Sequence, residues 1–203
     1  MLSGNKPDIP PVIWLIAGIV LVSALLQFKA SYFIYQHDLM LTEPWRWWTA
    51  HLVHVGWRHY LLNMLALACL PLIFPRLRPI TLLAGLVILS PLLSAGLYWA
   101  VPTVYAYAGL SGVLHGLYVV VALESLRIKT EQKFAGLVLL CIALKILCEK
   151  WLGYSQTAQL IQAPVLIESH QIGVFVGLVY ALAGYLVVIC WPGRLSVHPD
   201  RKS

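Results

Sequence analysis

The sequence predicts an all-α polytopic membrane protein, with a single domain of six membrane-spanning helices over residues 1–203. Three observations lead to this fold class. Hydrophobic residues make up 60% of the chain and charged residues only 11%, whereas soluble domains carry roughly 25% charged residues. The mean hydropathy is +0.80. The apolar residues also gather into six runs with short polar or basic segments between them.

Each apolar run is interpreted as one helix. The expected spans are 12–28, 60–74, 80–101, 111–126, 134–152 and 171–191. A full span needs about 20 residues, within a range of roughly 17–25, so the second and fourth runs are short. Polar residues stand at their beginnings, His59 and Asn63 in one and Ser111 in the other. This pattern favours helices that end inside the membrane at a protein-lined, water-filled cavity.

The orientation of the chain follows from its basic residues. Four of them lie toward one side of the predicted membrane: Lys29, Arg46, Arg58 and Lys150. Nine lie on the side of the two termini: Lys6, Arg76, Arg78, Arg127, Lys129, Lys133, Arg194, Arg201 and Lys202. Cytoplasmic loops are enriched in Lys and Arg, so we expect both termini, with a tail at 192–203, in the cytoplasm. The net charge of +6 then reflects orientation, and no soluble domain presents a basic face to nucleic acid.

Two outer loops have distinctive compositions. The first, 29–58, has four Trp residues between Trp45 and Trp57, and Trp favours the membrane–water interface. The fifth, 153–169, has a single charge, Glu168. Beside a cavity such a loop could act as a lid, and the alternative is an ordinary connector.

Ser111 is a candidate nucleophile. It lies between Gly109 and Gly112 at the expected start of the fourth helix, where free backbone N–H groups favour negative charge. A nucleophilic serine needs such groups and a base. The alternative is a helix-packing face, since Gly112 and Gly116 form a GxxxG pair.

His170 is the candidate base. Gly173 and Gly177 follow it at spacings that place both near the histidine face of the sixth helix. Close packing of this face on Gly112 and Gly116 would bring the imidazole toward Ser111. An interfacial histidine is the alternative. His115, one turn after Ser111, is a rival base.

His59 and Asn63 lie four residues apart, so their side chains share one helix face. Both can donate hydrogen bonds, and two donors facing a serine would suit an oxyanion hole. Interhelical hydrogen bonding is the alternative.

Together these pieces resemble the rhomboid family of intramembrane serine proteases. The resemblance rests on "WRWWTAHLVH" in the first outer loop, His59 with Asn63, "GLSG" at 109–112, and His170 with its two glycines. It implies a six-helix rhomboid bundle and a Ser111–His170 dyad without a third carboxylate, with no cofactor or metal. It also implies an oxyanion site formed by His59, Asn63 and the Ser111 N–H. His54 stands where rhomboids carry a structural histidine, and His115 where many carry an aromatic residue beside the catalytic imidazole.

The compact core and "GLSGVLHG" resemble the rhombosortase branch of bacterial rhomboids. That resemblance implies a multi-pass protein of the bacterial inner membrane whose active site opens to the periplasmic side. Its partners would be the lipid bilayer and membrane-anchored proteins. Their C-terminal tail would have a Gly-Gly stretch, a hydrophobic helix and basic residues.

Other functions remain as alternatives. One is a non-catalytic rhomboid-like chaperone or binding protein, although such proteins lose the Ser or His that this chain keeps. A histidine-ligated metal or haem protein is less favoured. A zinc protease would need a motif such as HExxH, which is absent, and only a few histidines could form the facing pairs that a haem needs. A transporter is disfavoured by the lack of paired broken helices. Lys145 and Glu149 are interpreted as a salt-bridged pair whose long side chains extend to the membrane–water interface.

Overall fold

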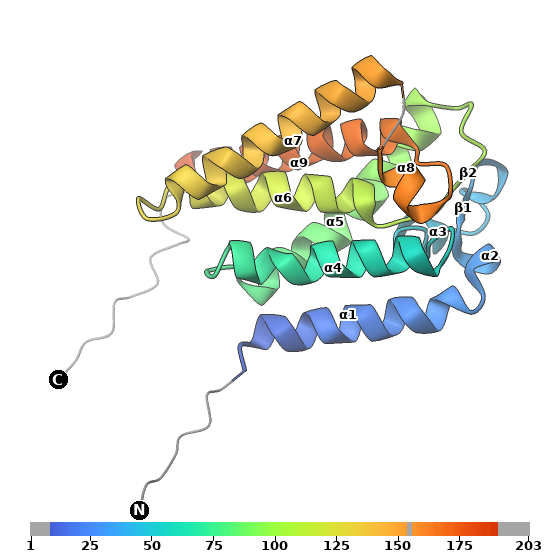
Figure 1. Cartoon of the computed structure of the whole chain (residues 1–203), viewed down its shortest axis with the longest axis horizontal. Helices are drawn as coiled ribbons and strands as arrows, with labels where there is room; N and C mark the ends of the chain where they lie inside the picture. The colour runs from blue at the N-terminus through green and yellow to red at the C-terminus, as the bar shows by residue number, and fades with distance from the viewer. Residues whose placement is uncertain (1–8, 154–155, 191–203) are drawn as a thin grey trace, which may run out of the picture.

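The computed structural model describes residues 9–153 and 156–190, and this part of the chain is mostly helical (Figure 1). Its long helices are α1 (Pro11–Gln27), α4 (Trp57–Ile73), α5 (Pro79–Ala100), α6 (Ser111–Ser125), α7 (Gln132–Leu152) and α9 (Ile167–Cys190). Each begins and ends within four residues of an expected apolar run. The expected tail, 192–203, lies outside the described residues.

Two helix starts differ most from expectation. Helix α4 begins at Trp57 and α9 at Ile167, three and four residues before their apolar runs. The first turns of these helices contain polar residues, among them Arg58 and Glu168, which a search for apolar runs passes over. His59 and His170 therefore lie inside regular helix rather than at its edge.

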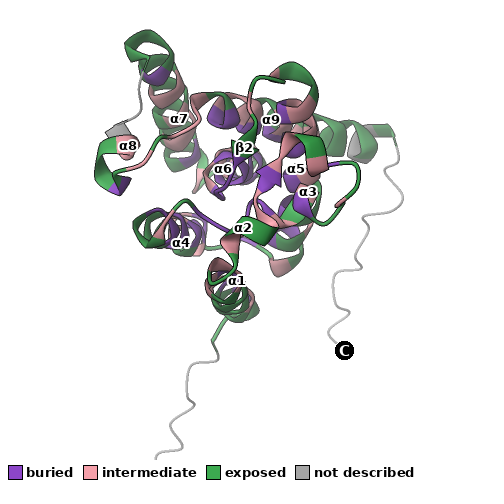
Figure 2. Ribbon diagram, turned by 90° about the vertical axis from the view of Figure 1, so that its right-hand side faces the viewer, coloured by how far each residue is buried: buried purple, intermediate pink, exposed green. Residues whose placement is uncertain are grey.

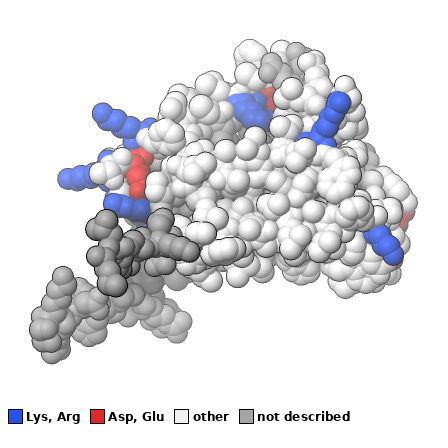
Figure 3. All heavy atoms as spheres, turned by 60° about the horizontal axis from the view of Figure 1, so that its bottom comes forward, with Lys and Arg blue, Asp and Glu red and all other residues white. Residues whose placement is uncertain are grey.

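The surface fits a bilayer. By length and composition, two helices among the described residues could cross a membrane, 79–100 and 167–187, and α1 and α6 are shorter apolar helices. Large apolar side chains on α1 and α9 are exposed, including Trp14, Leu21, Phe175 and Leu186, and soluble monomers rarely expose so much. On the face in Figure 3 the charges lie mainly toward the two ends of the molecule. The number of spans and the side of the termini stay predictions.

Helix α6 is the centre of the bundle. Seen along the helices, it lies among α4, α5, α7 and α9, while α1 lies outside against α4 (Figure 2). Ten of its fifteen residues are buried, so its side chains contact protein on nearly every side. The site at its first residue is consequently held by several helices at once.

Helices α6 and α9 touch backbone to backbone. A Cβ atom added at Gly173 would lie 1.9 Å from the Gly112 carbonyl oxygen, and one at Gly177 would lie 2.5 Å from that of Gly116. Only glycine permits this approach. The contact fixes the start of α9 beside the start of α6.

Short elements gather at the end of the bundle where α6 begins (Figure 1). They are α2 (Ala30–Phe33), β1 (Tyr35–Gln36), η1 (His37–Leu39), α3 (Arg46–Thr49), β2 (Ala106–Tyr107) and α8 (Gln156–Ile161). Strand β1 pairs antiparallel with β2, with Tyr35 opposite Tyr107. This pairing ties the loop at 29–58 to the segment that leads into Ser111.

His51 anchors the same loop to α5. Its Nε2 atom lies 2.9 Å from Ser94 Oγ, and that hydroxyl donates to the Trp47 carbonyl at 3.0 Å. Burial lowers the pKa of His51 to about 4, so the ring is neutral at pH 7.

Candidate active site

The turn before α6 presents Ser111 at the head of the helix. Gly109 has a φ of +143°, a conformation that L side chains rarely adopt. Its N–H donates to the Ala50 carbonyl at 3.0 Å, and its own carbonyl accepts from the Tyr107 hydroxyl at 2.6 Å. The turn is thereby fixed at both peptide groups, and Ser111 begins the helix half-buried.

His170 contacts the serine directly. Its Nε2 atom lies 3.0 Å from Ser111 Oγ, and the side chain is 2% exposed. The close glycine contact between α6 and α9 brings the two residues together, as the glycine spacing predicted. The distance is within the range that a general base needs to take a proton.

His115 holds a different position. Its ring stacks on that of His170, with centroids 4.3 Å apart and an interplanar angle of 22°. Its Nδ1 atom lies 2.7 Å from the Ser111 carbonyl oxygen, which can only accept, so Nδ1 carries the proton. Of the two candidate bases, His170 therefore has the contact with the hydroxyl, and His115 supports its ring.

A carboxylate also contacts His170, which sequence reasoning missed. Glu149 Oε2, from α7, lies 2.8 Å from His170 Nδ1, and Oε1 forms an ion pair with Lys145 Nζ. The expected Lys145–Glu149 pair is present, but its interpretation was wrong, because Glu149 is 5% exposed and points inward to the histidine. A carboxylate therefore lies beside the histidine of the expected Ser111–His170 dyad. The available signal was a lone acid within an apolar run.

His59 and Asn63 lie on the first turns of α4 and are both buried. Among the described residues, His59 Nδ1 and Asn63 Nδ2 have no hydrogen-bond partner. Buried polar atoms without partners are rare and cost free energy. His59 and Asn63 could therefore donate hydrogen bonds to an oxygen atom of a ligand bound beside Ser111.

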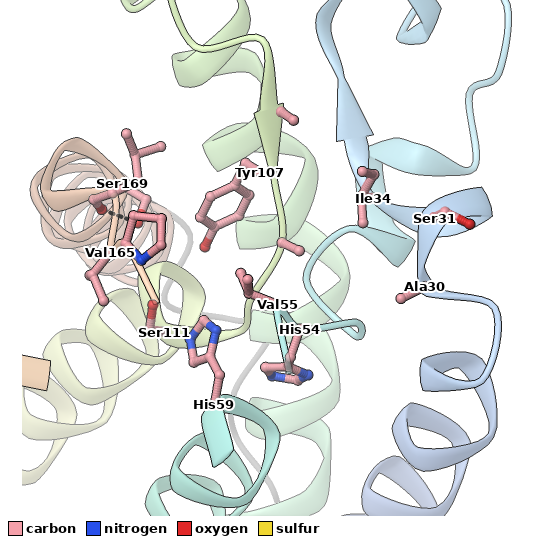
Figure 4. A pocket seen from close by; sticks show the side chains of 14 residues that line it. Ala30, Ser31, Ile34, His54, Val55, His59, Tyr107, Ser111, Val165 and Ser169 are labelled. Atoms are coloured by element: carbon pink, nitrogen blue, oxygen red, sulfur yellow. Dashed lines mark hydrogen bonds between the residues drawn. The ribbon is translucent and has the colours of Figure 1, made fainter. Parts of the chain in front are cut away.

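Two cavities meet at Ser111 and His59. One of about 500 Å³ opens among β2, α9 and the first loop, and Ser111, His59 and Tyr107 point into it (Figure 4). The fifth-loop residues Pro164 and Val165 line its edge. The other, of about 600 Å³, lies between α4, α7 and α8 and reaches Asn63, His115 and His170. A chain segment in either cavity would pass the serine.

His54 supports His59. The two rings meet edge to face with centroids 5.1 Å apart, and the His54 backbone is held by both atoms of the Gln27 amide at 2.8 Å. Burial, with a smaller effect of nearby His59, lowers the pKa of His54 to about 3. The His54 ring is therefore neutral at pH 7 and packs against His59 without a charge.

No cluster of three or more His, Cys, Asp or Glu side chains among the described residues could hold a metal ion.

Comparison with known families identifies the chain. The family description "Rhomboid domain" matches residues 41–186, a range that contains Ser111, His170, His59, Asn63 and Glu149. A comparison with curated proteins finds no match. The match covers well over half of the sequence, and the chain therefore belongs to the rhomboid family of intramembrane serine proteases.

Proposed function

We propose that the protein is an intramembrane serine endopeptidase in which Ser111 is the nucleophile and His170 the general base. The observation that carries this proposal is the 3.0 Å contact between His170 Nε2 and Ser111 Oγ. It lies beside two cavities large enough for an extended peptide.

The reaction follows acyl-transfer chemistry. His170 Nε2 takes the hydroxyl proton as Ser111 Oγ bonds to the scissile carbonyl carbon, whose π electrons move to its oxygen. The tetrahedral intermediate collapses, the C–N bond breaks, and the imidazolium gives its proton to the leaving amine. Water, deprotonated by His170, then attacks the acyl-enzyme and releases the new carboxyl terminus and free Ser111.

The oxyanion is bound by the Ser111 N–H, His59 and Asn63. Support comes from the first-turn position of Ser111 in α6 and from the buried, unpartnered Asn63 amide nitrogen. Preorganised donors of this kind stabilise charge that develops in the transition state. Asn63→Ala should lower turnover roughly 10²–10³-fold and still be labelled by a fluorophosphonate probe.

The substrate class is a membrane-anchored protein with a Gly-Gly tail of the rhombosortase type. Helix α6 runs from Ser111 toward the basic residues Arg127 and Lys129, so the serine faces the outer side if the positive-inside rule holds. A substrate helix must unwind there to expose a peptide bond. Glycine disfavours helix by about 1 kcal/mol relative to Ala, which makes unwinding at a Gly-Gly stretch easier.

Two serine-site variants test the function. In bacterial membranes containing a Gly-Gly-tailed protein, Ser111→Ala and His170→Ala should each abolish cleavage while the enzyme stays folded and inserted. His115→Ala should retain activity. Cleavage by Ser111→Ala would refute the proposal, and an active His170→Ala with an inactive His115→Ala would make His115 the base.

The substrate assignment has its own test. Replacing the tail glycines with Leu should block processing, and mass spectrometry of the released C-terminus shows whether the acyl group goes to water or to another amine. A Leu variant cut at the same bond and rate would contradict the unwinding argument and leave the serine protease standing.

A further inference from the structure

We infer that Glu149 is a positioning residue that extends the Ser111–His170 pair to a three-residue Ser–His–Glu arrangement. The inference rests on the proposed function, because it assigns a role within the same site. Glu149 acts through the imidazole and does not touch the substrate.

The geometry of the three side chains is continuous. Glu149 Oε2 lies 2.8 Å from His170 Nδ1, and His170 Nε2 lies 3.0 Å from Ser111 Oγ. The two contacts use opposite nitrogens of one ring. Three helices, α7, α9 and α6, contribute one residue each, so the arrangement depends on tertiary packing.

The carboxylate determines which nitrogen of His170 carries the proton. An ionised carboxylate only accepts hydrogen bonds, so Nδ1 must be the donor. Nε2 then keeps its lone pair and accepts from the Ser111 hydroxyl, as a base requires. In serine proteases with a Ser-His-Asp arrangement, loss of this control lowers kcat by about 10⁴.

The surroundings of Glu149 fit a charged group. The Glu149 side chain is 6% exposed, and its carboxylate forms an ion pair with the Lys145 ammonium. Buried charges need such pairing. When His170 takes the serine proton, the new imidazolium lies against a negative charge, while His115 stacks on the face of the ring. No proton moves to Glu149.

Two substitutions separate charge from shape. Glu149→Gln keeps the volume of the side chain and removes its charge, whereas Glu149→Asp keeps the charge and loses a methylene. We expect Glu149→Gln to lower kcat by roughly 10²–10⁴-fold with KM changed less than about threefold, and Glu149→Asp to retain more activity than Glu149→Gln. Glu168→Gln removes an exposed carboxylate from the first turn of α9 and is the matched control, with wild-type kinetics.

The outcomes are distinct. Glu149→Gln with wild-type kcat, or more active than Glu149→Asp, would mean that the side chain acts through shape alone, and the inference would fall while the protease assignment stood. Cleavage by Ser111→Ala would overturn the proposed function and the inference with it. Thermal unfolding in detergent shows that each variant is folded.

A spectroscopic measurement reads the tautomer of His170 directly in the unmodified site. ¹⁵N NMR of protein labelled in its histidine rings, with His170 assigned by the signals lost in His170→Ala, reports the tautomer of the neutral ring. The inference requires the proton on Nδ1. A His170 ring protonated on Nε2 would overturn it.

Discussion

The contact between α6 and α9 controls the distance between Ser111 and His170, and Gly173→Ala tests this control. Gly173 lies one turn after His170 on α9. A methyl group there would lie 1.9 Å from the Gly112 carbonyl oxygen, 2.7 Å from its carbon and 3.2 Å from its Cα. These are backbone atoms, so no side-chain rotation relieves the clash.

The required movement can be worked out. Real Cβ contacts essentially never fall below 3.0 Å, and ordinary contact begins at 3.4 Å, so the two helices must separate locally by about 1.1–1.5 Å. The Ser111–His170 contact of 3.0 Å would then exceed hydrogen-bond distance. A misplacement of about 1 Å costs on the order of 10²-fold in rate. Overpacking also destabilises by about 1–3 kcal/mol.

The assay is cleavage of a Gly-Gly-tailed substrate in detergent micelles, with thermal unfolding of the same samples. Gly184→Ala is the matched control, because it lies on the same helix and a Cβ there meets nothing within 4 Å. We expect Gly173→Ala to lose at least roughly 10²-fold in kcat, with Gly184→Ala at the wild-type rate. Equal activity in both variants would refute the claim that the glycine contact sets the serine–histidine distance.

Three further predictions concern the residues around the site. Gly109→Ala should inactivate the enzyme, since φ is +143° and the new methyl would lie 2.6 Å from His59 Cε1; wild-type cleavage by this variant would show that the turn relaxes. Asn63→Leu should raise the thermal midpoint while slowing turnover, because an unpartnered buried amide nitrogen costs about 1–3 kcal/mol; a lower midpoint would mean that the amide is paired. The stability contributed by neutral His51 is complete above about pH 6.5 and is lost as the pH falls toward the folded pKa of about 4. Between pH 6.5 and pH 5 the free energy of unfolding should fall by about 1–2 kcal/mol on this account. Unfolding measured at these two pH values should therefore show a smaller fall in His51→Gln than in the wild type.

The sequence predicted the approximate positions of the long helices, because a run of many consecutive apolar residues is a local pattern that tertiary structure seldom overrides. It also predicted the pairing of the glycine faces, since Gly112, Gly116, Gly173 and Gly177 share one spacing and only close backbone contact uses it fully. The contact between Ser111 and His170 lies where those two faces meet, and their catalytic roles stay predictions.

The role of Glu149 could not be predicted in the same way. The spacing along α7 shows that Glu149 and Lys145 lie on the same face of the helix. It does not show which neighbouring helix that face contacts. The rotation of α7 depends on packing against α6 and α9, which a single helix does not encode. The short β1–β2 pairing was missed for a similar reason, because two residues on each strand leave no periodic pattern.

The buried polar atoms without hydrogen-bond partners near the site are held in place by packing. His59 Nδ1, Asn63 Nδ2 and both ring nitrogens of His54 have no partner among the described residues, so these groups oppose folding rather than favour it. The Gly112–Gly173 contact and the buried faces of α6 supply the compensating stability from apolar and backbone packing. Donors that are unsatisfied in the free enzyme can form their strongest hydrogen bonds in the transition state, where binding energy raises kcat. If His59 and Asn63 were paired with other protein groups, they would have no donors left for an oxyanion. Close glycine packing stabilises the bundle without using these donors, so the two features are compatible.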